Sequence, residues 1–219
     1  MTSQAKEHIL DRLKAASADV GVYYPQRYDW KPPVFTPKER AERFVKLLET
    51  MKAQVVPVKK KEMLSSLRAL LQEKNVSRLA YGAGSKLAKQ LEASWRQNKA
   101  ETELVPIVGS AEEFRDELFG INAGITSSLG GIADTGAIIV WPDKHEPRLL
   151  SLVPPLHIVI VEKSQIYSSF SEVIEMQKWP ESMPTNALLI SGPSKTADIE
   201  LILQFGVHGP KELLVLLVE

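Results

Sequence analysis

The apolar residues of the chain alternate between helical and strand-like spacing. Residues 36–51 and 63–71 place apolar side chains on one face of a helix, and Thr36-Pro37-Lys38-Glu39 is a typical capping box at the start of the first. Short runs between and after these segments, at 53–58, 77–82 and 104–107, have the composition of strands. This half of the chain therefore predicts alternating helices and strands.

The second half is richer in strands and small residues. Residues 121–141 and 156–162 predict strands, and a helix is expected over 164–177. A strand ALLIS follows, then a helix opened by Gly192-Pro193-Ser194 and running around 197–205. The last run, ELLVLLV, is apolar on both faces and predicts a strand inside a sheet. The fold class expected is α/β, with a mainly parallel central sheet flanked by helices.

The first 35 residues differ from the rest. Residues 4–16 predict a short amphipathic helix, and VGVYYPQRYDWKPPVF reads as an extended, aromatic arm because its prolines restrict the backbone. We interpret residues 1–35 as an N-terminal helical and extended arm and 36–219 as the α/β domain. The arm is expected to pack on its own domain or, as the alternative, on a partner.

Composition narrows the class of protein. The 219 residues carry 27 Lys plus Arg and 27 Asp plus Glu, so overall charge gives no attraction to nucleic acid. The longest aliphatic run is far shorter than a membrane span, and the first residues lack the apolar stretch of a signal peptide. We expect a cytoplasmic protein without membrane insertion. Because there is no cysteine, the chain offers no thiol nucleophile and no thiolate ligands for an iron–sulfur cluster.

Two glycine-containing loops could bind an anion, since ligands of α/β proteins usually lie where strands lead into helices. Gly82-Ala83-Gly84-Ser85 lacks the third glycine of a dinucleotide fingerprint and is interpreted as a plain strand-to-helix turn. The second loop, residues 191–200, is the candidate ligand site. In it Gly192, Ser194, Lys195 and Thr196 would hold the anion at the predicted helix start, and Asp198 or Glu200 could transfer a proton. A capped surface helix is the alternative.

Residues 125–136 form a hydroxyl- and glycine-rich turn in which Ser127, Ser128, Asp134 and Thr135 could contact a ligand; an ordinary glycine turn is the alternative. Among the histidines, His208 is a third candidate acid or base, and His145 is expected to be exposed. His157 is expected at a strand edge or hydrogen-bonded in the core. No histidine pair has metal-binding spacing, so no metal site is predicted.

The runs GITSSLGGIADTGAIIV, PRLLSLVPPLHIVIVE and LLISGPSKTADIELILQFGVHGPKELLVLLVE resemble the LUD-domain family of lactate-utilisation protein C, also called LutC or YkgG. Its motifs fall on Thr126–Ser127, Gly130, Ile132–Gly136, Gly192–Glu200 and Gly206–Pro210. The resemblance implies a fold like that of the NagB/RpiA/CoA-transferase group. It also implies a role in L-lactate utilisation beside two iron–sulfur partner proteins, which would hold all the clusters.

Two main functions remain open from the sequence, and a pure assembly scaffold is a third possibility. The first is a non-redox subunit or accessory protein of a system that oxidises lactate to pyruvate, binding a small anion, its iron–sulfur partners or both. The second is a free-standing enzyme of this fold that acts on a phosphorylated or carboxylated metabolite. No glutamate stands in a setting like the CoA-transferase nucleophile motif, which argues against thioester chemistry.

Overall fold

The computed structural model describes residues 3–18, 31–98, 101–108, 114, 117–197, 203–205 and 209–219. The chain divides into two compact units, residues 1–31 and 32–219. The first contains helix α1 (Ser3–Ala18), where the sequence predicts a helix over 4–16. Across the described part of the chain, no helix is both long and apolar enough to cross a membrane.

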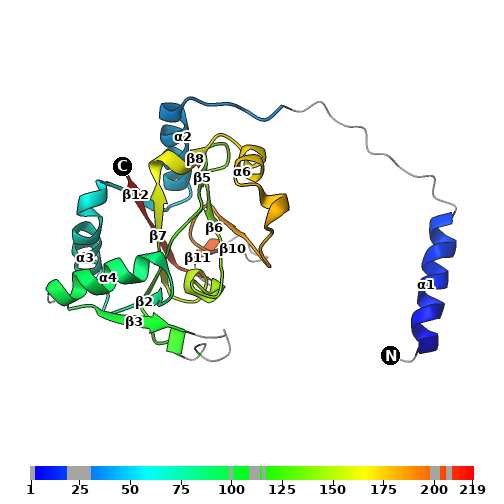
Figure 1. Cartoon of the computed structure of the whole chain (residues 1–219), viewed down its shortest axis with the longest axis horizontal. Helices are drawn as coiled ribbons and strands as arrows, with labels where there is room; N and C mark the ends of the chain where they lie inside the picture. Colours follow the sequence, from blue (N-terminus) through cyan, green and yellow to red (C-terminus); the bar gives the residue numbers. More distant parts are fainter. Residues whose placement is uncertain are drawn as a thin grey trace. The chain divides into compact units, whose positions relative to one another are not determined.

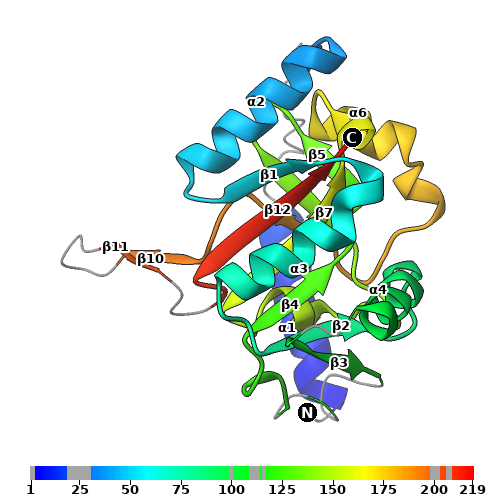
Figure 2. The same ribbon diagram turned by 90° about the vertical axis from the view of Figure 1, so that its left-hand side faces the viewer.

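The core of the second unit (Figure 1) is a six-stranded sheet in the order β1-β12-β7-β4-β2-β3, with every neighbouring pair parallel (Figure 2). Its strands are β1 (Gln54–Val58), β2 (Arg78–Gly82), β3 (Glu103–Ile107), β4 (Ala123–Thr126), β7 (Leu156–Glu162) and β12 (Glu212–Val218). The ELLVLLV run lies between β1 and β7, and its residues from Leu213 to Val218 are buried. The predicted parallel sheet is thus confirmed. The ELLVLLV strand is apolar on both faces, and its position inside the sheet covers both of them.

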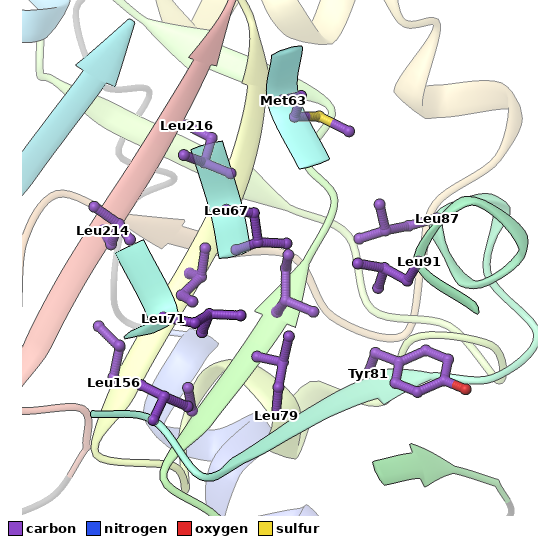
Figure 3. Packing of buried hydrophobic residues seen from close by; sticks show 14 of the residues in the cluster. Met63, Leu67, Leu71, Leu79, Tyr81, Leu87, Leu91, Leu156, Leu214 and Leu216 are labelled. Carbon is purple, nitrogen blue, oxygen red and sulfur yellow. The ribbon is translucent and has the colours of Figure 1, made fainter. Parts of the chain in front are cut away.

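Helices α3 (Met63–Glu73) and α4 (Lys86–Gln97) cover one face of this sheet. Leu67 and Leu71 of α3 and Leu91 of α4 pack against Leu79 and Leu214 from the strands (Figure 3). Ser85 begins α4 as its cap, since its side chain accepts a hydrogen bond from the backbone N–H of Ala88. Residues 82–85 are thus the strand-to-helix turn that the sequence predicts.

The other face is covered by helix α2 (Pro37–Thr50) and a second sheet in the order β8-β5-β6-β9. Its strands are β5 (Gly130–Ile132), β6 (Ala137–Val140), β8 (Ile166–Tyr167) and β9 (Leu188–Ile190). Thr36 and Glu39 form the predicted capping box of α2. Phe44 of α2 lies so close to Gly131 that a Cβ there would be 2.4 Å from its ring. The sequence predicts the strands of this layer but not their assembly into a separate sheet.

One predicted helix is shorter than expected, and another is wrong. The helix expected over 164–177 is a 3-10 turn, strand β8 and a shorter helix, α6 (Phe170–Met176). Where a helix was expected around 197–205, β10 (Lys195–Ala197) pairs antiparallel with β11 (Leu203–Phe205), and this hairpin projects from the rest of the unit (Figure 2). A hydroxyl residue and acidic residues after Gly192-Pro193 are as typical of a turn as of a helix start. Pairing between β10 and β11 supplies backbone hydrogen bonds that a helix would otherwise have supplied.

Short 3-10 segments complete the described unit: η1 (Lys60–Glu62), η2 (Arg148–Ser151), η3 (Lys163–Gln165) and η4 (Trp179–Glu181).

Candidate functional site

The parallel sheet has a topological switch point between β2 and β4. From β2 the chain leads through α4 to β3 on one side, whereas from β4 it leads toward β7 on the other. The chain therefore runs in opposite directions from two neighbouring strand ends. These ends are followed by the turn at residues 82–85 after β2 and by Ser127 after β4. Such a point is the usual ligand crevice of an open α/β sheet.

In this protein the crevice is filled by the chain's own loop, residues 142–147. Glu146 Oε2 accepts hydrogen bonds from Ser127 N at 3.1 Å and from Ser127 Oγ at 2.6 Å. Asp143 Oδ1 holds the loop by accepting from the backbone N–H groups of His145 and Glu146 at 2.7 and 2.8 Å. A Cβ on Gly82 would be 2.0 Å from the His145 carbonyl oxygen, so only glycine fits beneath this loop.

Burial of the Glu146 carboxylate raises its pKa above the ordinary 4.5, although hydrogen bonds from Ser127 and Ser85 act in the opposite direction. A carboxyl group with a raised pKa beside two hydroxyls has the features of an acid–base site. The sequence analysis expected only that the neighbouring His145 is exposed, which is confirmed, and it gave Glu146 no role.

A cavity of about 270 Å³ lies on the face of the central sheet that α2 and the second sheet cover, at the start of β7 and β12. It is referred to below as the His157 cavity, and its lining includes Ser151, His157, Ser191, Gly192, Ser194 and Gly209. Its volume is slightly below the roughly 300 Å³ at which pockets for drug-sized ligands begin. The space suits a small metabolite better than a dinucleotide.

His157 is only 1% exposed. Its Nε2 lies 2.8 Å from Thr126 Oγ1, and its Nδ1 has no hydrogen-bond partner within the described part of the chain. Burial lowers the pKa of His157 to about 3, so the ring is neutral at physiological pH. Buried polar atoms are nearly always paired, so the unpaired Nδ1 of this cavity-lining residue is unusual and needs a partner.

The roof of the His157 cavity is made by two segments from the predicted motifs. Ser194 donates its backbone N–H to the carbonyl of Pro210 at 2.9 Å. A Cβ on Gly209 would lie 3.1 Å from Ser194 Cβ, and one on Gly192 would lie 3.0 Å from Met51 at the end of α2. Small residues at 192 and 209 thus let the two segments approach each other and α2.

The predicted ligand residues do not form one site: some lie at the His157 cavity, some make contacts elsewhere, and some cannot be placed. Gly192 and Ser194 line the His157 cavity, and Lys195 is exposed beside it as the first residue of β10. Ser127 binds Glu146, whereas Ser128 Oγ donates to the carbonyl of Ile160 at 2.7 Å.

The remaining candidates do not reach the cavity or cannot be placed. Asp134 and Thr135 lie in the turn between β5 and β6, where the backbone N–H of Asp134 donates to Ser168 O. Thr196 is in β10, opposite Gln204, so it caps no helix. The candidate acids and bases Asp198, Glu200 and His208 lie outside the described residues. Within the described ranges no three His, Cys, Asp or Glu side chains form a group that could hold a metal.

The expectation that His157 would be hydrogen-bonded in the core is confirmed, and the sequence also carries a signal for its partner. Thr126 and His157 are polar residues within apolar strands, and each alternates with buried aliphatic neighbours on the opposite face. A polar residue at such a position needs a buried partner, and each is the partner of the other. For Glu146 no local signal exists, because its position depends on where a loop returns to the sheet.

Comparison with known proteins supplies the family. A family model described as the LUD domain matches residues 41–218. An uncharacterised protein of Neisseria meningitidis is 34% identical over 97% of this chain and 92% of its own length. A lactate utilization protein C from Macrococcus caseolyticus is 42% identical over 41% of this chain and 40% of its own.

A lactate utilization protein C 1 from Bacillus mycoides is 29% identical over 74% of this chain and 71% of its own length. The fold matches the crystal structure of a DUF162 family protein from Deinococcus radiodurans, with a TM-score of 0.62 and 24% identity over 84% of this chain and 99% of that one. Together with the parallel sheet already described, the match over residues 41–218 establishes that the chain belongs to the LUD domain family.

Proposed function

We propose that this chain is a non-redox component of an L-lactate utilisation system and that it binds a small metabolite in the His157 cavity. The lactate role is supported by relatives named lactate utilization protein C, from Macrococcus and Bacillus. Because the chain has no cysteine, cluster-dependent electron transfer would be the task of two iron–sulfur partner proteins in the cytoplasm.

One observation supports ligand binding: the buried His157 lines a cavity, and its Nδ1 has no hydrogen-bond partner. The roof of this cavity is formed by residues 192–194 and 209–210, which belong to the family motifs. An orphaned polar atom costs free energy in a closed core, whereas a ligand with a complementary group removes that cost. A structural histidine would be expected to have both ring nitrogens bonded.

The cellular role is tested by deleting the gene in its source organism. Growth on L-lactate as sole carbon source should slow, growth on glucose should not change, and the intact gene should restore growth. The His157→Gln variant should restore it poorly, while His8→Gln, a change of an exposed histidine on α1, should restore it fully. Unchanged growth on lactate after deletion would refute the role.

Partner binding is tested by co-expressing the tagged full chain with the two iron–sulfur proteins of the same system. Recovery of both on the tag, also after washing in high salt, supports assembly. Recovery of neither removes the partner half of the proposal.

A second candidate function is an acid–base enzyme, favoured by the raised pKa of Glu146 beside Ser127. The protein would be incubated in D₂O with phosphorylated and carboxylated metabolites, and loss of carbon-bound protons followed by NMR. Exchange that disappears in Glu146→Gln but persists in Glu175→Gln, an exposed carboxylate on α6, would favour the enzyme. No exchange with any compound would eliminate proton abstraction from this panel.

A further inference from the structure

The hydrogen bonding of Thr126 determines which nitrogen of His157 carries the proton. Thr126 is 2% exposed, and within the described residues its hydroxyl has a single hydrogen-bond partner, His157 Nε2, at 2.8 Å. A hydroxyl has one proton to donate, and a neutral imidazole has one N–H and one bare nitrogen. Only two arrangements are therefore compatible with this contact.

In the first arrangement the Thr126 hydroxyl donates to a bare Nε2, and the ring proton is on Nδ1. One buried donor, Nδ1–H, is then left to be satisfied. In the second, Nε2–H donates to Thr126, which leaves both the Thr126 hydroxyl proton and the Nδ1 lone pair without partners. Because each unpaired buried group costs free energy, the first arrangement is favoured.

This inference rests on the proposed binding function and specifies its ligand. We propose that His157 donates its Nδ1–H to a ligand in the His157 cavity and that this ligand presents a carbonyl or carboxylate oxygen. Thr126 is the positioning residue, since it fixes the tautomer. The cavity adds hydroxyls from Ser191 and Ser194, whereas that of Ser151 already donates to the carbonyl of Arg148, and none of its described lining residues is charged. A group that only donates hydrogen bonds, such as an ammonium, would find no acceptor on this ring.

The tautomer can be measured directly. Histidines 8, 145 and 208 are replaced by glutamine, so that His157 is the only histidine, and the ring is labelled with ¹⁵N. A long-range ¹H–¹⁵N correlation spectrum then shows which ring nitrogen is protonated, in a protein unaltered at positions 126 and 157. We expect Nδ1–H. Thr126→Ser, which keeps the hydroxyl, should leave Nδ1–H dominant, whereas Thr126→Val should produce a mixture of tautomers.

Ligand chemistry is tested by adding L-lactate, pyruvate, L-lactamide and isopropylamine in turn. L-Lactate, pyruvate or L-lactamide should shift the Nδ1–H signal, and isopropylammonium should not. A shift with L-lactate but not L-lactamide identifies a carboxylate, and shifts with both identify a carbonyl-type oxygen. Thr126→Val should weaken binding of the active probe about tenfold, the value of one hydrogen bond, and Thr126→Ser much less.

Three outcomes would overturn the inference. They are an Nε2–H tautomer in the free protein, a shift caused only by isopropylammonium, and no shift with any of the four probes. None of these results depends on growth or on partner recovery. If lactate growth is unchanged by deletion while the tautomer and probe results are as expected, the proposed cellular role fails alone and the binding chemistry remains.

Discussion

The carboxylate of Glu146 lies 2.6 Å from the hydroxyl of Ser127, and this contact closes the crevice where a sheet of this topology usually binds its ligand. Ser127 directly follows β4, whereas Glu146 belongs to the loop that returns over the turn after β2. A cavity lies instead at the start of β7 and β12, lined by His157. The usual location of α/β ligand sites does not apply here, because the chain itself occupies it.

Glu146→Gln is expected to change the unfolding free energy at neutral pH by less than about 1 kcal/mol. The amide oxygen of glutamine can still accept from Ser127, and the cost of burying a charge is removed. Glu146→Ala should be less stable by about 1–3 kcal/mol, because it leaves the Ser127 donors unpaired. Urea unfolding of the three proteins measures the difference, and equal losses in both variants would contradict this account.

The same carboxylate predicts a pH dependence. Its folded-state pKa is raised above 4.5, so just above that pH the folded protein holds a proton that the unfolded chain has released. Glu146 therefore lowers stability as pH rises through this window. In Glu146→Gln this decrease in unfolding free energy with rising pH should be absent. Urea unfolding at a series of pH values measures the slope of unfolding free energy against pH. Identical slopes for wild type and variant would count against a raised pKa of Glu146.

Gly82→Ala and Gly84→Ala form a matched pair of tests of the crevice loop. A Cβ on Gly82 would lie 2.0 Å from the backbone carbonyl of His145, whereas one on Gly84 would meet the end of the exposed His145 side chain. We expect Gly82→Ala to cost about 1–3 kcal/mol, as overpacking does, and Gly84→Ala to cost much less. Thermal unfolding compares them, and similar losses would show that the loop is not rigidly seated.

The sequence predicts the central sheet because its signal is strong and local. Residues 213–218 are apolar at every position, which is typical of a short strand covered on both faces, and β12 lies inside the sheet accordingly. The cap at Thr36 and the turn at 82–85 are likewise defined by a few neighbouring residues. Such features depend little on the rest of the chain.

Features that depend on distant segments were not predictable in the same way. Residues 195–205 contain apolar and polar positions that suit either a helix or a hairpin, and the choice is made by pairing Lys195 with Phe205. The candidate site has the same origin. Thr126 and His157 come from different strands, and the sequence contains no information on their register until the sheet order is known.

Gly209→Ala should reduce the room in the His157 cavity at little cost in stability. Its Cβ would be 3.1 Å from Ser194 Cβ, only slightly closer than an ordinary contact, so a small shift of the roof can accommodate it. Binding of the probe that shifts His157 Nδ1–H should weaken, which a titration followed by NMR would measure. Gly120→Ala, at an exposed position away from the cavity, is the control. Undiminished binding in Gly209→Ala would indicate that ligands do not reach this roof.

His157 should make the protein sensitive to mild acid. Burial lowers its folded-state pKa to about 3, against 6.5 for an ordinary histidine. Between pH 3 and 6.5 His157 is therefore protonated in the unfolded chain but not in the folded protein. The contribution of His157 is thus fully present above pH 6.5 and is lost as pH falls, by at most about 1.4 kcal/mol per pH unit. In His157→Gln, which cannot titrate, unfolding free energy should fall less steeply between pH 6.5 and 5 than in wild type or in His8→Gln. Parallel slopes in all three proteins would mean that the ring is protonated in the folded state, and that it could not then serve as the neutral donor on which ligand binding depends.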